Sequence, residues 1–152
     1  MFWAKKQKIE SIEVPLKIIE LEFDNYHILL EGTFRDGTTA FWVIDTGASK
    51  TVLDKNLTEQ YKLIETSNPE DYQSAGINQG MMETAVGELK YINIRGLEIE
   101  NRKVALIDLS HVNEIYSKYT TCQIAGLIGG DILMHYHSKI DYENKVIRFL
   151  KI

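Results

Sequence analysis

The feature that most restricts how this chain can fold is a short turn of small residues between two apolar segments. Residues 40–44 read Ala-Phe-Trp-Val-Ile, the turn Asp45-Thr46-Gly47-Ala48-Ser49 follows, and residues 51–53 read Thr-Val-Leu. Short apolar runs that are rich in β-branched and aromatic residues and end at a Gly-containing turn are typical of buried strands. The chain must therefore place the Asp45 carboxyl at the end of a buried strand, where an ionised and unpaired acid is costly.

Most of the remaining sequence also predicts strands joined by turns. Arg35-Asp36-Gly37 separates the runs 26–34 and 38–44, and an Asp-Gly pair between apolar runs is a strong hairpin signal. Further strands are expected at 81–94 and 97–109 around Arg95-Gly96, at 124–128, and at 138–142 and 145–150 around Glu143-Asn144. The segment 9–21 contains Pro15 and is expected at a sheet edge, because proline cannot donate to a strand ladder.

Few segments have the character of a helix. A short helix is expected over residues 54–61 with Asp54 as N-cap, and another over 132–136 with Asp131 as N-cap. Residues 67–80 are predicted to form a polar loop. Residues 110–121 are compatible with a loop and with one helical turn, and the sequence does not decide between them. Many short strands with one or two short helices predict an all-β fold, a closed or partly open β-barrel or a sandwich.

Length, composition and charge narrow the class of protein. The chain has 152 residues, of which 44% are hydrophobic and 26% charged, as in a globular domain. We expect a flexible tail over residues 1–8, which lack the apolar run of a secretory signal, and one domain over 9–152. The net charge of −5 argues against nucleic acid as a partner. No apolar run approaches the roughly 18 residues that span a membrane. The lone Cys122 excludes an intrachain disulfide, and a reducing, cytoplasmic setting fits best.

The Asp45 turn by itself permits two interpretations. In the first, Asp45 forms an Asx-turn and its carboxylate only binds its own backbone. In the second, the turn holds a carboxyl rigidly for acid–base chemistry. Gly47 would then allow a sharp bend and the close approach of a ligand, and Thr46 would supply a hydroxyl for a fixed hydrogen bond. The tripeptide alone does not decide between them.

The flanks of the turn favour the second interpretation. Residues 41–53, FWVIDTGASKTVL, resemble the active-site segment of aspartic peptidases of the retropepsin type. Residues 126–133, GLIGGDIL, resemble that family's second landmark, a strand and short helix that support the catalytic loop. Residues 74–89 lie where the family carries its flap, a hairpin that closes over the substrate. Residues 139–149 resemble the terminal hairpin of bacterial single-domain relatives, so the resemblance implies an acid-protease-like β-barrel.

The resemblance also implies roles for individual residues. Asp45 would be the catalytic acid, Thr46 would brace the paired loops through its hydroxyl, and Gly47 would lie nearest the scissile bond. The residues that it places against the substrate are Ala48 and Ser49 in the groove and Gly76, Ile77 and Gly80 in the flap. No metal or organic cofactor is implied.

A single Asp45 supplies only half of such a site. Aspartic peptidases use two facing carboxyls that share one proton, since two neighbouring carboxylates cannot both ionise. The sequence contains one such turn, so the second carboxyl is expected from another copy across a two-fold axis. Viral members often pair an acid at the position of Ser49 with an arginine at that of Gly130 to brace the dimer, and this chain has neither.

The sequence therefore predicts an aspartic endopeptidase that acts as a homodimer on a peptide or protein substrate. Two alternatives remain: a catalytically silent peptide-binding or structural module of the same fold, and a regulatory sensor domain that recognises a peptide without releasing it. Other polar residues suggest structural roles. His135 and His137 lack further ligands for a metal, His27 and His111 stand alone, and Cys122 is interpreted as a small buried apolar residue.

Overall fold

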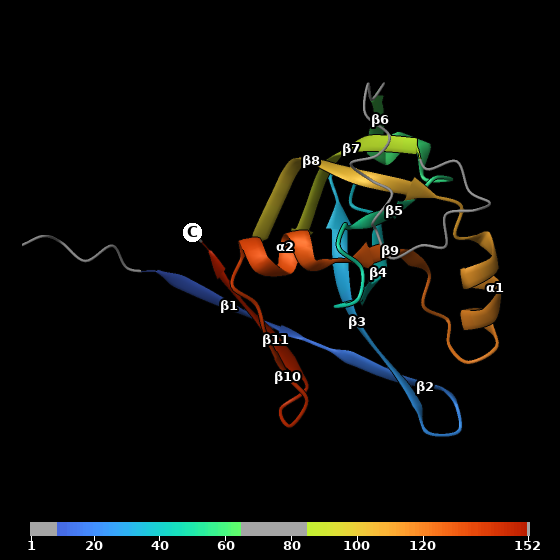
Figure 1. Cartoon of the computed structure of the whole chain (residues 1–152), viewed down its shortest axis with the longest axis vertical. Helices are drawn as coiled ribbons and strands as arrows, with labels where there is room; N and C mark the ends of the chain where they lie inside the picture. Colours follow the sequence, from blue (N-terminus) through green and yellow to red (C-terminus); the bar gives the residue numbers. More distant parts are fainter. Residues whose placement is uncertain (1–8, 65–84, 152) are drawn as a thin grey trace, which may run out of the picture.

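Strands make up most of the computed structural model, which describes residues 9–64 and 85–151 (Figure 1). The strands are β1 (Glu10–Pro15), β2 (Lys17–Glu22), β3 (Asn25–Phe34), β4 (Thr39–Ile44), β5 (Val52–Asp54), β6 (Tyr61–Ile64), β7 (Ala85–Ile94), β8 (Leu97–Ile107), β9 (Ile124–Ile128), β10 (Lys139–Asp141) and β11 (Val146–Lys151). The helical elements are the 3-10 turn η1 (Thr58–Gln60) and the helices α1 (Ser110–Ser117) and α2 (Gly130–His135). The predicted all-β class with short helices is confirmed.

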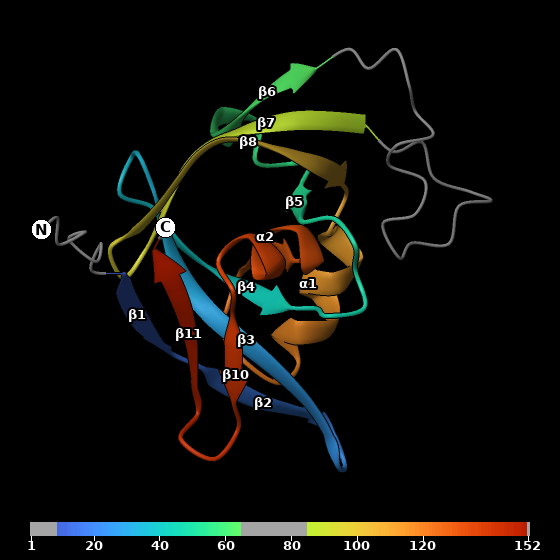
Figure 2. The ribbon, with the colours of Figure 1, turned by 60° about the vertical axis from the view of Figure 1, so that its left-hand side comes forward.

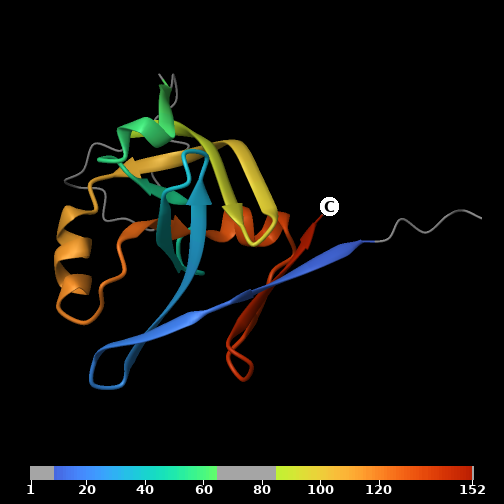
Figure 3. The ribbon, with the colours of Figure 1, turned by 180° about the vertical axis from the view of Figure 1, so that it is seen from behind.

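The strands of the described residues form two sheets. The larger has the order β2-β3-β4-β9-β5-β8-β7-β6. An additional pairing of β3 with β7 closes part of this sheet into a barrel, whose strands are β3, β4, β9, β5, β8 and β7. The smaller has the order β1-β11-β10. The tips of the β2–β3 and β10–β11 hairpins project on the same side of the molecule (Figures 2 and 3). The prediction of a barrel is thus confirmed, with a separate three-stranded sheet beside it.

The turn residues identified from the sequence fix the hairpins. At the β3–β4 turn, Gly37 adopts a φ of 87° and the Thr38 N–H donates to Asp36 Oδ1 at 2.9 Å. At the β7–β8 turn, Arg95 and Gly96 have φ values of 51° and 96°. Positive φ at two successive residues matches the twist of two-residue hairpins. These turns set the registers of the strands that follow them.

Two hydrophobic clusters occupy opposite faces of β3 and β4. Leu30 and Trp42 belong to the larger cluster, whereas Leu29 and Val43 belong to the second, which also contains Tyr116 of α1 and Cys122. Successive residues of a strand point to opposite faces, so the same two strands contribute to both clusters. Helix α1 thus packs over the face of the sheet that Leu29 and Val43 share, and Cys122 is buried as expected.

The structure corrects several details of the predicted elements. The segment 9–21 is two strands, β1 and β2, which separate at Leu16 and join different sheets; Pro15 ends β1, which lies at a sheet edge as expected. The helix expected over 54–61 is wrong, because only η1 is helical and it has no side-chain cap. Asp54 instead ends β5 in a buried position, where its Oδ1 accepts the N–H groups of Asn56 and Leu109, each at 3.1 Å. The predicted tail 1–8 and loop 67–80 lie outside the described residues.

Candidate active site

The Asp45 turn begins where β4 leaves the sheet. The Asp45 N–H donates to Ile128 O at 2.9 Å and so extends the parallel pairing of β4 with β9. The Ala48 N–H donates to Asp45 O at 3.2 Å, and the Gly47 N–H donates to Asp45 Oδ1 at 3.0 Å. The carboxylate is therefore held by its own turn, as the Asx interpretation predicted. The same bond also fixes one oxygen in place, as acid–base chemistry requires.

The predicted site residues differ in exposure along the turn. Asp45 is half-buried, Ala48 is buried, and Thr46, Gly47 and Ser49 are exposed. One side of the turn is thus set into the fold and the other faces outward. The structure brings these five residues together, whereas the predicted flap contacts Gly76, Ile77 and Gly80 lie outside the described residues.

The segment after β9 supports the turn from behind. The Gly130 N–H donates to Ala48 O at 2.7 Å, and the Asp131 N–H donates to Ser49 O at 3.2 Å. The approach requires glycine at position 129, because a Cβ there would lie 2.6 Å from Lys50 C and 2.8 Å from Ala48 O. This contact between residues 45–49 and 129–131 is the one that the sequence resemblance implied.

Asp131 has a different role from the helix cap that the sequence predicted. It lies inside the first turn of α2, whose N-cap is Gly129 and has no side-chain cap. Asp131 Oδ1 accepts both the N–H of Thr51, at 2.9 Å, and its hydroxyl, at 2.7 Å. Thr51 Oγ1 in turn accepts the Gly129 N–H at 3.1 Å, and Arg102 of β8 lies 3.9 Å from Asp131 Oδ2. Asp131 therefore joins three segments behind the Asp45 turn.

Tyr116 of α1 interacts with His27 of β3 and with the charge of Asp45. Its hydroxyl is 2.8 Å from His27 Nδ1, and the two rings meet edge-to-face with centroids 5.6 Å apart. Burial, together with the negative charge of Asp45, raises the pKa of Tyr116 to about 12. The phenol is therefore protonated throughout the range in which carboxyl groups titrate, and it lies within electrostatic reach of Asp45.

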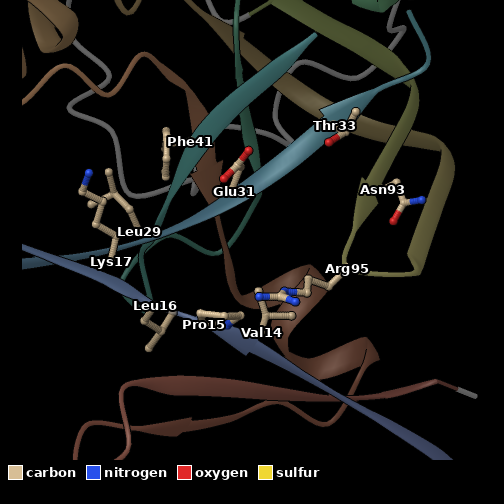
Figure 4. A pocket seen from close by; sticks show the side chains of 10 residues that line it. All are labelled: Val14, Pro15, Leu16, Lys17, Leu29, Glu31, Thr33, Phe41, Asn93 and Arg95. Carbon is tan, nitrogen blue, oxygen red and sulfur yellow. The ribbon is translucent and has the colours of Figure 1, made fainter. Parts of the chain in front are cut away.

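One cavity among the described residues is lined by no residue of the Asp45 turn (Figure 4). It measures about 640 Å³ and is lined by Val14, Pro15, Leu16, Lys17, Leu29, Glu31, Thr33, Phe41, Asn93 and Arg95. Phe41 precedes Asp45 by four residues on β4, a separation of about 13 Å along an extended strand. The Asp45 turn therefore forms no part of the lining of this cavity.

The described residues contain no candidate metal centre. Within residues 9–64 and 85–151, no three His, Cys, Asp or Glu side chains are grouped so that they could hold a metal ion. His135 and His137 are exposed. No helix in the described part of the chain has the length and apolar character needed to cross a membrane.

Sequence reasoning missed two polar contacts between distant segments. Thr51 was interpreted only as part of a strand and His27 as an isolated structural residue, whereas Thr51 bonds to Asp131 and His27 Nδ1 lies 2.8 Å from the Tyr116 hydroxyl. The partners are 80 and 89 positions apart in the sequence, so no local pattern marks them.

Comparisons with known proteins identify the family and the fold of the chain. The family described as "Aspartyl protease" matches residues 30–132. A crystal structure of a retropepsin-like aspartic protease from Rickettsia conorii aligns over 99% of this chain and 100% of its own, with 16% identity and a TM-score of 0.52. The crystal structure of edgp aligns over 98% of this chain and 48% of its own, with 10% identity and a TM-score of 0.55. The retroviral protease-like domain of Ddi1 from Leishmania major gives 15% identity, coverages of 82% and 91%, and a TM-score of 0.46. No curated protein sequence matches the chain.

Proposed function

We propose, because the chain belongs to the aspartyl protease family, that it is an endopeptidase in which Asp45 is the catalytic carboxyl. The observation that carries this proposal is the placement of Asp45. Its carboxyl is half-buried at the end of β4, and one oxygen is held at 3.0 Å by the Gly47 N–H. The structure around it serves to fix the turn, since β9 and α2 bind its backbone from behind.

The second carboxyl is proposed to come from another copy of the chain. No other aspartate of the described residues lies in a turn of this kind against β9. The outward side of the turn is formed by Thr46 and Gly47, which are exposed in the single chain. Two such turns that face each other across a two-fold axis would cover these residues and bring the two Asp45 carboxyls together.

The proposed reaction follows from the chemistry of a shared proton. One Asp45 carboxylate removes a proton from a water molecule while the protonated partner donates its proton to the oxygen of the scissile carbonyl. The water oxygen bonds to the carbonyl carbon and gives a tetrahedral diol. The protonated carboxyl then donates its proton to the peptide nitrogen, the C–N bond breaks, and a diol hydroxyl gives its proton back to the pair, which is again singly protonated. Ala48 and Ser49, next to the acid, would line the groove for an extended peptide.

Replacement of Asp45 with asparagine tests this proposal directly. Asparagine has the same shape but cannot exchange a proton, so we expect cleavage of a peptide library to fall by at least about 10³-fold. Asp141→Asn, in the β10–β11 hairpin, is the matched control and should retain wild-type cleavage. Undiminished cleavage by Asp45→Asn would refute the assignment.

The dimer is tested separately by its concentration dependence. If each site needs two copies, specific activity should rise with protomer concentration in parallel with the dimer fraction measured by sedimentation. An active species that sediments only as a monomer would overturn the dimer and leave the role of Asp45 intact. A wild-type chain that binds peptides without cleaving them would instead favour the silent peptide-binding module.

A further inference from the structure

The cavity of Figure 4 lies where β3 changes its neighbour at one edge. Leu29 of β3 pairs with Lys17 of β2, and Thr33 pairs with Asn93 of β7. Glu31 lies midway between Leu29 and Thr33 and, within the described strands, has a partner in neither β2 nor β7. All five of these residues line the cavity. The cavity is therefore built over a gap in the strand ladder.

Pro15 explains why β2 does not extend across this gap. In the antiparallel register that pairs Lys17 with Leu29, the residue opposite Glu31 would be Pro15. Proline has no N–H to donate to the Glu31 carbonyl. Pro15 pairs instead with Val146 of β11, so the chain enters the larger sheet only after this point. The proline thus keeps the gap open on the side of β2.

The main chain of Glu31 points into the gap. Phe41, which lies opposite Glu31 on β4, donates its N–H to Gln123 O at 2.9 Å, away from β3. Glu31 and Phe41 therefore form a non-hydrogen-bonded pair, in which the main-chain groups of both residues point outward from the two strands. The N–H and C=O of Glu31 face the gap, where one residue of an extended peptide would bond to them as a strand does.

Two cationic side chains flank the gap, Lys17 at the β2 end and Arg95 at the β7 end. Arg95 belongs to the β7–β8 turn, in which Asn93 Oδ1 accepts the Gly96 N–H at 2.7 Å. Figure 4 shows the Arg95 guanidinium extended from this turn into the cavity. Neither cation forms an ion pair with any residue that the structure describes. The lining thus carries two positive side chains and one acid, Glu31, in a chain of net charge −5, which favours an anionic ligand.

The floor of the cavity is apolar. Val14, Leu16 and Leu29 are buried, and Phe41 is half-buried. Lys17 Nζ lies 5.6 Å from the centre of the Phe41 ring, so positive charge and apolar surface meet at one wall. At about 640 Å³, the cavity has room for an apolar side chain together with its main chain. A ligand that matches this lining carries an apolar group, an amide and a negative charge close together.

We propose that the cavity binds the carboxyl-terminal residue of a peptide whose last side chain is apolar. The terminal carboxylate pairs with Arg95 and Lys17. The amide N–H of the last residue donates to the Glu31 carbonyl, and its side chain packs on Leu29 and Phe41. A fatty acid would match the cations and the floor but has no N–H to donate to Glu31. The turn that carries the proposed catalytic acid contributes nothing to the lining, so this site is separate from the peptidase site.

Nitrogen-15 NMR of the full chain tests the proposal, with Asp45→Asn present so that the peptide is not cut. The probe is a short glycine–serine peptide that ends in leucine with a free carboxyl group. Its addition should shift the amide resonances of Glu31 and Thr33 in a saturable way. Amidation of the carboxyl group removes the charged acceptor and should weaken binding by at least about tenfold.

Substitution of the cations should give a graded loss. Arg95→Gln and Lys17→Gln should each weaken binding of the free-carboxyl peptide by about fivefold, as expected for an exposed ion pair. The double variant should bind the free and amidated peptides within about twofold of each other, because the groups that distinguish them are gone. Arg148→Gln removes an exposed cation of β11 that does not line the cavity, and it is the charge-matched control that should bind as the parent does.

Four results would overturn the proposal. Free and amidated peptides that bind equally would remove the role of the carboxylate. An equal loss in Arg148→Gln and Arg95→Gln would show that net charge alone attracts the peptide. Acetate or decanoate that binds as tightly as the peptide would assign the cavity to simple carboxylates and leave the Glu31 main chain without a role. Shifts confined to residues 45–49 would place the peptide at the catalytic turn instead.

Discussion

Replacement of Asp131 with alanine removes the group that joins the segments behind the Asp45 turn. The side chain of Asp131 is 11% exposed, and its Oδ1 accepts two hydrogen bonds from Thr51, which is itself fully buried. Alanine leaves the Thr51 N–H without its acceptor inside the protein. It also frees the hydroxyl that positions the Gly129 N–H. Asp131→Ala should therefore lower the free energy of unfolding by more than the removal of an ordinary surface carboxylate does.

The structure allows the cost to be estimated. A hydrogen bond to a charged acceptor contributes about 1.5–3 kcal/mol, so the two bonds from Thr51 together contribute about 3 kcal/mol at the lower end of that range. The Arg102 ion pair adds at most about 0.5 kcal/mol, because its 3.9 Å separation is long and the Arg102 side chain is 24% exposed. We expect Asp131→Ala to lower the free energy of unfolding by about 3 kcal/mol. Asp131→Asn keeps one acceptor and should cost about half as much.

Urea unfolding at a fixed protomer concentration measures these differences, since any dimer makes stability depend on concentration. Glu143→Gln, an exposed change in the β10–β11 turn, is the control and should fall within about 0.5 kcal/mol of the wild type. Thr51→Val should lose most of its own effect when it is combined with Asp131→Ala, because both changes remove the same bond. A loss below about 1 kcal/mol for Asp131→Ala, with an unchanged slope, would refute the view that Asp131 holds the turn.

Two further predictions concern single positions elsewhere in the fold. Gly126→Ala should prevent cooperative folding, because its Cβ would lie 2.0 Å from Val52 O and 2.5 Å from the Trp42 ring. Circular dichroism melts of this variant should show no sharp transition. Gly96→Ala, whose Cβ would meet open space, is the control and should still melt cooperatively. Hydrogen bonds from the Ser110 side chain and backbone, and then from Asn56, lower the pKa of Asp108 from 3.8 to about 2. The difference in free energy of unfolding between the wild type and Asp108→Asn should therefore have its full value above pH 4 and disappear as the pH falls towards 2. Urea unfolding that gives the same pH profile for both proteins would contradict this assignment.

The hairpins were predictable because their determinants are local. Gly37 and Gly96 adopt positive φ, which glycine permits without strain, and the alternating apolar residues on each side define the strands. The β9 strand was predicted at its observed bounds, 124–128. Residues 54–61 show the limit of such reasoning. The sequence there has an acceptable N-cap, but Asp54 is buried and binds the Leu109 N–H, a group 55 residues away.

The turn that forms the candidate site was recognisable from the sequence, whereas the contacts around it were only partly so. The turn Asp45 to Ser49 and its contact with residues 129–131 follow from a motif that the sequence displays. The bonds between Asp131 and Thr51 connect residues 80 positions apart, and no local pattern marks them. The sequence did not decide whether residues 110–121 form a helix, because their helical pattern is weak. The helix found there, α1, supplies Tyr116. Its position depends on packing against the outer face of β3 and β4.

The sequence by itself determined that this chain forms short strands and hairpins and carries one acid in a turn of small residues, because turn chemistry and hydrophobic alternation act over a few residues. Tertiary structure alone decided what surrounds that acid. The insertion of β9 between β4 and β5 brings Asp131 behind the Asp45 turn, and the packing of α1 brings Tyr116 within electrostatic reach of Asp45. These contacts join distant segments, and their stability comes from burial and hydrogen bonds that exist only once the barrel has formed.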